Sequence, residues 1–328
     1  MVIIDKNPVV NFSSMKAENR KDGLSGFIRA KNEGDYIYQV IESWIELVDE
    51  LVIVFNDCTD NTESEICRAI KDFGCNKIKA YKYIPKVYPQ GSDEHINLPC
   101  DDIHSLVNYY NYSLSKTTRK FVVKIDGDII FDPCCKHKIK SFMESQKING
   151  FYKLHGVNLI DNDGMLFVPS NSMFCGMNGD LCIFPVSEKN VFKHRPEFEY
   201  LDLSDLKDCG GSFAYYHMKF VKRDMGFSNY LLNENPNSRY VEITKKFIVG
   251  LSFIPIDIIL NKYNIKLSSP ETLGINSILS RDFKKSYINN LNATNVKINL
   301  TEYLLYYFSN IKYRLKQNIK FVVKKYAR

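Results

Sequence analysis

Residues 26–62 of this chain read "GFIRAKNEGDYIYQVIESWIELVDELVIVFNDCTDNT". The beginning of this stretch predicts a strand over 25–32, because apolar residues lead into a polar turn. Residues 50–57 form a short apolar run rich in β-branched residues, which favours a strand buried on both faces. Between the two strands, apolar residues recur at helical spacing, at Ile37, Val40, Ile41, Trp44, Ile45 and Val48. The stretch therefore predicts a strand, a helix and a second strand.

The same alternation continues along the chain. The patterns predict, in order, a helix, a strand, a loop, a helix and a strand, over 62–73, 77–83, 85–99, 101–116 and from 121 onward. Strand and helix alternate about every 25 to 35 residues, which is typical of an α/β protein with a mostly parallel sheet and helices on both faces. Two more strands are predicted over 150–160 and 180–186, joined by a loop rich in glycine and asparagine.

The strand from 121 ends in an acidic turn, in the stretch "FVVKIDGDIIFDP" (121–133). Parallel sheets bind ligands outside the carboxyl ends of their strands, so we expect Asp126 and Asp128 at the ligand-binding edge. Gly127 lets the backbone come close to a ligand, and two carboxylates at this spacing can bind a hard divalent cation together with phosphate oxygens and water. A turn without a function is the alternative.

Two other polar turns are expected at the same edge, "RAKNEGD" after the first strand and "FNDCTDNT" after the second. Acidic turns after strands also cap helices, so neither turn indicates a site by itself.

The composition indicates a globular protein of 328 residues, with 45% hydrophobic residues. The longest apolar run, 247–260, is interrupted by Pro255 and Asp257 and is shorter than the roughly 18 residues of a membrane span. The N-terminal residues do not have the pattern of a secretory signal, which predicts a cytoplasmic location. The nine cysteines lack metal-binding spacing, so we expect reduced thiols.

The net charge of +6 is concentrated in the last segment of the chain, and the rest is close to neutral. This segment carries seven basic residues and no acid, at Lys312, Arg314, Lys316, Lys320, Lys324, Lys325 and Arg328. From Tyr303 onward its apolar residues recur every three or four positions, which predicts a basic amphipathic helix. Such a helix binds the anionic inner face of a membrane or packs on the protein itself.

Four segments carry a resemblance to a known family: "FIRAKNE" (27–33), "NDCTD" (56–60), "YYNY" (109–112) and "KIDGD" (124–128). Through them the chain resembles nucleotide-sugar-dependent glycosyltransferases of the GT-A fold, family 2 type. It is most similar to bacterial β1,4-N-acetylgalactosaminyltransferases that assemble lipooligosaccharide. The resemblance covers residues 24–135 and implies a Rossmann-like, mostly parallel α/β sheet with "DGD" in place of the family's Asp-X-Asp motif.

The resemblance also implies a UDP-sugar donor and a divalent metal, Mn²⁺ or Mg²⁺, which neutralises the charge of the leaving diphosphate. Asp128 would bind this metal directly. Asp126 would contact the ribose, or the metal through water.

Further edge residues take the places of the family's nucleotide contacts. Asn56 and Asp57 lie where the family holds the base, and Arg29 and Glu33 match its nucleotide pocket. Asn111, on the helix before the motif strand, would reach the donor sugar or ribose, or would be an exposed polar residue.

An inverting displacement needs a base that removes the proton of the attacking hydroxyl. The resemblance places this acid in the second half of the chain. The candidates are Glu199 and Asp202, which we rank first, and then Asp180 and Glu197. Each of them could instead be a surface acid.

The segment "YYHMKFVKR" (215–223) offers further ligands. His217 could supply another metal ligand, with Lys219 and Lys222 beside the diphosphate. A histidine in such an apolar setting can also be a core residue.

The predicted organisation is a GT-A domain over 1–235, with a nucleotide-sugar half (24–135) and an acceptor half (136–235), followed by a mainly helical segment (236–328). The predicted function is metal-dependent inverting transfer of a hexose or N-acetylhexosamine to a bacterial surface glycan or glycolipid, such as lipooligosaccharide, capsule or O-antigen. UDP-GalNAc or UDP-Gal is the expected donor.

Two other functions stay open. A sugar nucleotidyltransferase would normally have a glycine-rich phosphate loop, which "IRAKNEGD" lacks. A basic nucleic-acid-binding protein would carry a basic stripe on its body, so no nucleic-acid partner is expected. The sequence does not predict an oligomeric state.

Overall fold

The computed structural model describes residues 2–74, 76–145, 149–162, 165–169, 177–195 and 198–222. It also describes shorter pieces of the rest of the chain, at 232, 235, 238, 240–243, 245, 253–256, 299–301, 303–309 and 311–312. The chain divides into two compact units. Of the described residues, the first unit contains those within 2–156 and 179–218, and the second contains the others. The sequence-based boundary at residue 235 stays a prediction.

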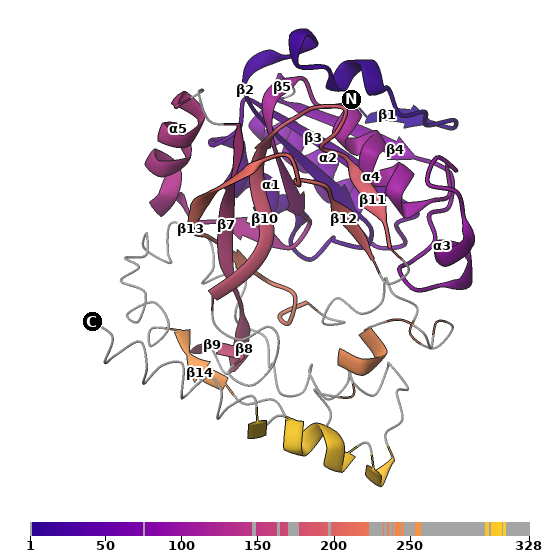
Figure 1. Cartoon of the computed structure of the whole chain (residues 1–328), viewed down its shortest axis with the longest axis vertical. Helices are drawn as coiled ribbons and strands as arrows, with labels where there is room; N and C mark the ends of the chain where they lie inside the picture. The colour runs from indigo at the N-terminus through magenta and orange to yellow at the C-terminus, as the bar shows by residue number, and fades with distance from the viewer. Residues whose placement is uncertain are drawn as a thin grey trace. The chain divides into compact units, whose positions relative to one another are not determined.

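The largest of the described sheets has nine strands, in the order β1-β4-β3-β2-β5-β10-β7-β13-β6 (Figure 1). Its strands are β1 (Val2–Asp5), β2 (Lys21–Ala30), β3 (Glu50–Asn56), β4 (Ile78–Tyr83), β5 (Arg119–Asp126), β6 (Ile129–Phe131), β7 (Gly150–Asn158), β10 (Met177–Pro185) and β13 (Lys207–His217). The four pairs from β1 to β5 are all parallel, whereas β10 pairs with β5, and β13 with β6, in antiparallel orientation. The predicted mostly parallel α/β sheet is confirmed.

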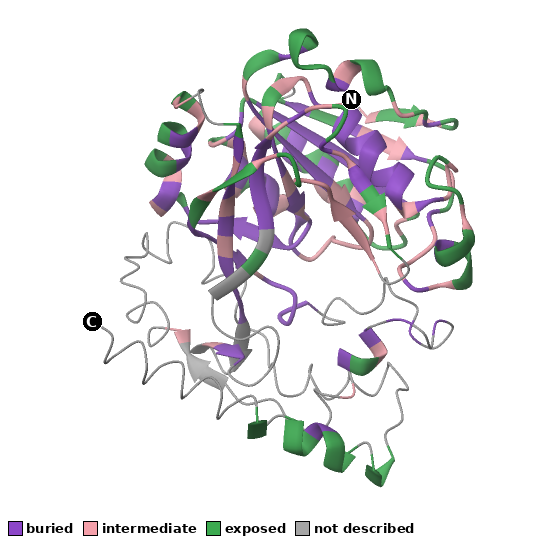
Figure 2. Cartoon of the chain, in the orientation of Figure 1, coloured by how far each residue is buried: buried purple, intermediate pink, exposed green. Residues whose placement is uncertain are grey.

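Helices cover both faces of this sheet, as the sequence predicted. They are α1 (Ile37–Ile45), α2 (Thr62–Phe73), α3 (Asp93–Asn97), α4 (Leu106–Ser115) and α5 (Lys136–Glu144). Helix α4 packs its aromatic residues on the sheet face that carries Phe27, Val52 and Val54. On the opposite face, the position of a Cβ at Gly26 lies 3.3 Å from Val48, which follows α1. The central strands are buried between these layers (Figure 2).

Three short turns of 3₁₀ helix and a hairpin complete the first unit. The turns lie at Phe12–Met15, Ala17–Asn19 and Pro133–Cys135, and the hairpin consists of β11 (Phe192–His194) and β12 (Glu199–Leu201). Helix α3 lies within the predicted loop 85–99, where the Ser92 hydroxyl caps it by accepting a hydrogen bond from His95 N. Its five residues are too few for a periodic pattern to be visible in the sequence.

The predicted glycine- and asparagine-rich loop after β7 is wrong in part. Two short strands lie there, β8 (Ile160–Asn162) and β9 (Met165–Pro169), and both belong to a second, three-stranded sheet. β9 pairs with β14 (Phe253–Pro255), so its strand conformation depends on a distant segment.

Parts of residues 300–312 are helical, at 300–301, 303–309 and 311–312. The predicted basic part of this helix beyond Lys312 lies outside the described residues. Within the described residues, no helix is both long enough and apolar enough to cross a membrane.

Candidate active site at the carboxyl edge of the sheet

The turns after β2, β3 and β5 lie together at one edge of the sheet. The parallel register pairs Arg29 with Asp126 and Ala30 with Phe55, so the three strands end at the same level. Across the edge, Lys31 Nζ lies 2.9 Å from Asp57 Oδ2. The three polar turns that the sequence placed at one edge do therefore meet.

The ends of β2 and β3 both have unusual backbone geometry. Asn32 (φ 53°) and Asp57 (φ 45°) lie in the left-handed region, which Asn and Asp tolerate better than other residues that carry a side chain. Thr59 N donates a hydrogen bond of 2.8 Å to Asn32 Oδ1, which holds the two turns together. Left-handed residues held by their surroundings often mark functional sites.

Gly127 lets two turns come close to each other. A Cβ at this position would lie 2.5 Å from Glu33 Cγ and 2.9 Å from Glu33 Cβ. The sequence predicted that Gly127 makes room for a ligand, and the structure shows the Glu33 side chain as its neighbour. Glu33 N in turn donates to Thr62 Oγ1 at 2.7 Å.

Asp126 is paired with two cations. Its Oδ2 lies 3.1 Å from Lys124 Nζ, and its Oδ1 lies 3.9 Å from Arg29 Nη2. The side chain of Asp126 is 30% exposed, whereas those of Lys124 and Arg29 are 13% and 14% exposed. The carboxylate of Asp126 is therefore largely neutralised by the protein itself.

Asp128 has a different environment. Its side chain is only 6% exposed, and its Oδ1 lies 3.2 Å from His217 Nε2. The antiparallel pair β13 and β6 aligns His217 with Ile129, and Met218 N donates to Asp128 O at 2.8 Å. The structure thus brings together two of the three predicted metal ligands.

A carboxylate and an imidazole at this distance can both bind a divalent cation, which commonly completes its shell with phosphate oxygens and water. Asp128 and His217 therefore fit such an ion as a pair. No group of three or more acidic, histidine or cysteine side chains with metal-binding geometry occurs in the described part of the chain.

Arg29 lies on an aromatic stack that sequence reasoning missed. Its guanidinium carbon lies 3.2 Å from the centroid of the Tyr110 ring, and Tyr110 stacks on Phe192 at 4.3 Å. Burial raises the pKa of Tyr110 to about 12, so its phenol stays neutral. Arg29 Nε is buried and has no hydrogen-bond partner within the described residues. The one signal in the sequence was the aromatic run "YYNY" beside Asn111.

Asn56 and Asn111, which were predicted to contact the donor, make hydrogen bonds to the protein backbone with their side-chain amides. Asn56 Nδ2 donates to Tyr83 O at 2.8 Å and to Pro85 O at 2.7 Å. Asn111 Nδ2 donates to Phe192 O at 2.9 Å, and its Oδ1 accepts from Phe192 N at 2.8 Å. Both side chains are buried, so their predicted contacts with the donor stay predictions.

The candidate bases are in contrasting environments. Asp202 Oδ2 lies 2.5 Å from Lys193 Nζ, and this partner, together with Ser204, lowers the pKa of Asp202 to about 2. The side chain of Glu199 is fully buried and accepts a hydrogen bond of 2.8 Å from Gln90 Nε2. Asp180 lies on β10, but its side chain is outside the described part, and so is Glu197.

Lys219 and Lys222 are both buried and belong to the second unit. Within that unit Lys219 Nζ lies 4.7 Å from the centroid of the Tyr240 ring. The predicted contacts of the two lysines with a diphosphate stay predictions.

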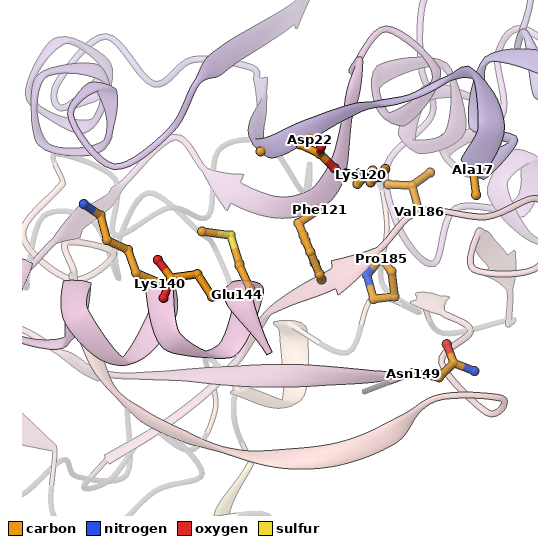
Figure 3. Close-up of a pocket in the computed structure, with 11 residues that line it drawn as sticks. Ala17, Asp22, Lys120, Phe121, Lys140, Glu144, Asn149, Pro185 and Val186 are labelled. Atoms are coloured by element: carbon orange, nitrogen blue, oxygen red, sulfur yellow. Dashed lines mark ion pairs between the residues drawn. The ribbon is translucent and has the colours of Figure 1, made fainter. Parts of the chain in front are cut away.

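A cavity of about 630 Å³ lies at the opposite edge of the sheet (Figure 3). It is lined by the first residues of β2 and β5 and by the end of β10. Lys140 and Glu144 reach it from α5, and Asp22 and Lys120 form an ion pair of 2.6 Å on its wall. None of its lining residues is among the predicted site residues.

A mostly parallel sheet with charged side chains at the carboxyl ends of its strands defines a class of α/β proteins that bind a ligand at this edge. Residues 9–192 match the family model described as Beta-1,4-N-acetylgalactosaminyltransferase (CgtA). The match covers more than half of the chain, so the chain belongs to this family of glycosyltransferases. No curated protein is significantly similar to it in sequence.

Solved structures with some likeness include glucosyl-3-phosphoglycerate synthase from Mycobacterium tuberculosis in complex with Mg²⁺ and UDP. It has 19% identity and a TM-score of 0.30, over 47% of this chain and 50% of that chain. The chain thus spans about half the length of that protein. Another is S. aureus TarS 1-349, with 11% identity and a TM-score of 0.38, over 85% of this chain and 76% of that chain. Both TM-scores lie below 0.5.

Proposed function

We propose that this chain is a metal-dependent, inverting glycosyltransferase that moves a hexose or N-acetylhexosamine from a UDP-sugar to a bacterial surface glycan. Family membership supports the reaction class. The observation that carries the proposal is the pair of the buried Asp128 and the partly exposed His217, at the carboxyl edge beside Asp126, Lys124 and Arg29. These groups match the needs of a nucleoside diphosphate and its cation.

Asp128 and His217 would hold the divalent cation. A cation bound there supplies Lewis-acid stabilisation of the charge that develops on the leaving diphosphate. To bind this cation beside Asp128, His217 would turn the lone pair of Nε2, which lies 3.2 Å from Asp128 Oδ1, toward the ion.

Asp126 is proposed to orient the donor, since Lys124 and Arg29 already compensate its charge. A carboxylate that shares two cations is a weaker ligand for a metal than one that does not. We therefore assign Asp126 to the ribose, and Arg29 with Lys124 to the negative charge of the nucleotide.

The catalytic base belongs to the acids of the second half of the chain. A base that acts near neutral pH needs a pKa close to that pH. The pKa of about 2 makes Asp202 a poor match. Asp180 and Glu197 stay candidates for the base, whereas the side chain of Glu199 has no exposed surface from which to reach an acceptor.

The test is calorimetry with UDP and Mn²⁺. The wild-type protein should bind UDP more tightly with the metal than without it. Asp128→Asn should remove this dependence, and Asp126→Asn should weaken binding of UDP in both conditions. Asp22→Asn, which breaks an ion pair at the opposite edge, is the matched control. A wild-type protein that binds no UDP with or without Mn²⁺ would contradict the proposal.

A hydrolysis screen then identifies the donor sugar. UDP-GalNAc, UDP-GlcNAc, UDP-Gal and UDP-Glc are incubated with the protein and Mn²⁺, and released UDP is measured. Turnover of UDP-GalNAc or UDP-Gal is expected, and a clear preference for UDP-Glc would contradict the expected donor.

The proposed acceptor is anchored in a membrane, which the protein would reach through its C-terminal residues. The helical part of 300–312 exposes large apolar side chains to solvent, at Leu300, Tyr303, Leu304, Leu305, Tyr307, Phe308 and Ile311. Beyond it the sequence is basic and lacks acids. Apolar insertion together with positive charge is the combination by which peripheral proteins bind anionic lipid.

A further inference from the structure

The loop between β4 and α4, residues 84–105, leaves the sheet at the carboxyl edge next to Asn56. The two amide hydrogens of Asn56 hold its beginning, through Tyr83 O and Pro85 O. Its two ends are tied together as well, since His104 Nδ1 lies 2.7 Å from Lys86 O. The loop therefore forms a wall beside the end of β3, where the resemblance places the nucleotide base.

The middle of this loop is held by the β11–β12 hairpin. Gln90 Nε2 donates to Glu199 Oε2 at 2.8 Å, and His95 Nδ1 lies 3.5 Å from Glu199 Oε1. The rings of His95 and His194 are 5.0 Å apart. Because His194 and Glu199 are paired across the two strands, their side chains lie on the same face of the hairpin.

These contacts are enclosed in the protein. The side chains of His95 and Glu199 are 1% and 0% exposed. Glu199 Oε1 and His95 Nε2 make no hydrogen bond with any described residue. A carboxylate with no exposed surface cannot meet the hydroxyl of an incoming sugar in this arrangement, whereas it can hold the loop and the hairpin together.

The same hairpin reaches the Arg29 stack. Phe192 of β11 stacks on Tyr110, and Asn111 fixes the backbone of Phe192 from α4. The hairpin thus contacts both the loop wall and the residue that supports Arg29.

We propose that Glu199 is a positioning residue: with Gln90 and His95 it clamps the loop 84–105 onto the hairpin and so shapes the nucleotide pocket, instead of acting as the catalytic base. The expected effect of this clamp on nucleotide binding rests on the proposed function. The contacts between loop and hairpin do not depend on that function.

The test compares Glu199→Ala and Glu199→Gln with the wild type. The matched control is Glu188→Gln, an exposed acid between β10 and β11. Amide hydrogen exchange over 84–105 is measured without ligand. Exchange should be faster in Glu199→Ala, closer to wild type in Glu199→Gln, whose amide oxygen can still accept from Gln90, and unchanged in Glu188→Gln. Unchanged exchange in both Glu199 variants would overturn the clamp. If the alanine variant does not fold, Gln90→Ala takes its place, because it removes the other partner of the 2.8 Å hydrogen bond, and unchanged exchange in Gln90→Ala would then overturn the clamp.

The second measurement is the Kd of UDP with Mn²⁺, together with kcat and KM for donor hydrolysis. If the loop then occupies its position in about a tenth of the molecules, the Kd of Glu199→Ala should rise about tenfold, with KM rising and kcat nearly unchanged. Glu199→Gln should recover most of this loss.

A catalytic base would give the opposite result. Both variants would then lose roughly 10²-fold to 10⁴-fold in kcat, with the Kd of UDP unchanged, and that outcome would overturn the positioning role. Absence of UDP binding by the wild type would instead contradict the proposed function, while the exchange comparison would still support or overturn the clamp.

Discussion

At the scale of single residues, the contacts at the carboxyl edge restrict which amino acids can occupy positions 126 to 128. Asp126 and Asp128 are two positions apart, yet the first is paired with two cations and the second with an imidazole. Gly127 between them has no room for a side chain, because Glu33 occupies that space. The identity of all three residues is therefore constrained by contacts as well as by any ligand.

Gly127→Ala is expected to destabilise the protein. The new methyl would lie within 3 Å of Glu33 Cβ and Cγ, and such overpacking typically costs about 1–3 kcal/mol. Urea denaturation gives the loss in the free energy of unfolding. In a Glu33→Ala background the same substitution should cost less, since Cγ is absent. Equal costs in both backgrounds would contradict the assigned contact.

A second residue-scale prediction concerns pH. Burial lowers the pKa of His95 below its ordinary value of 6.5, with His194 acting in the same direction and Glu199 opposing both. The unfolded chain then binds a proton at His95 more readily than the folded chain. The contribution of His95 to the free energy of unfolding is therefore complete above about pH 6.5 and is lost as the pH falls below that value.

Urea denaturation at pH 7.5 and pH 5.5 measures this effect, and His95→Gln should show a smaller loss on acidification than the wild type. His155, whose pKa burial also lowers, still contributes in the variant. An identical loss in both proteins would show that His95 is not held neutral in the folded state.

At the scale of elements, the side-chain amide of Asn111 on α4 binds the backbone of the β11–β12 hairpin. Asn111 satisfies both the N–H and the C=O of Phe192, and all of these atoms are buried. A buried backbone group left without its partner costs about 1–3 kcal/mol. This role explains why a polar residue stands on the packed side of α4.

Asn111→Ala should therefore lower the free energy of unfolding by about 2–6 kcal/mol, because two backbone groups lose their partner. Asn111→Asp should also be destabilised, because a carboxylate can accept from Phe192 N but cannot donate to Phe192 O. Urea denaturation of the wild type and both variants measures these losses in the free energy of unfolding. Normal stability combined with lost binding of the donor would instead favour the direct contact with the sugar that the sequence predicted.

At the scale of the whole molecule, the two edges of the central sheet differ in character. The carboxyl edge gathers the proposed site, while the cavity at the amino edge is lined by residues without a proposed role. The second unit contributes the exposed apolar side chains of the C-terminal helix. The proposed membrane attachment would therefore involve the second unit and not the first.

Attachment is tested by sedimentation with vesicles. The full chain should bind vesicles containing anionic lipid, bind neutral vesicles less, and lose affinity as salt is raised. The double variant Leu305→Ser/Phe308→Ser should bind more weakly, since these side chains are 64% and 63% exposed. Val9→Ser, which changes an equally exposed apolar residue of the first unit (65%), is the control. Equal binding by all variants would contradict insertion of this helix.

The sequence by itself determined the parallel α/β core. The helix predicted over 62–73 matches α2, and the strands predicted from 50 and 77 match β3 and β4 within a residue or two. Hydrophobic periodicity is a local property, and it survives in the fold because each element buries the face that its own residues define. The same reasoning placed Asp126 and Asp128 at the carboxyl edge of the sheet, where Asp126 ends β5.

The tertiary structure alone decided which side chains meet. The short strands β8 and β9 were missed because β9 pairs on one side with β14, which lies far along the chain, and β8 pairs with β9. The same holds for the stacking of Arg29 on Tyr110, the closure of Glu199 against the loop and the inward turn of Asn111. The sequence analysis named Asp128 and His217 separately as metal ligands, but only the antiparallel register of β13 on β6 brings them within 3.2 Å. Contacts between distant segments depend on packing, and no local pattern in the sequence encodes the partner.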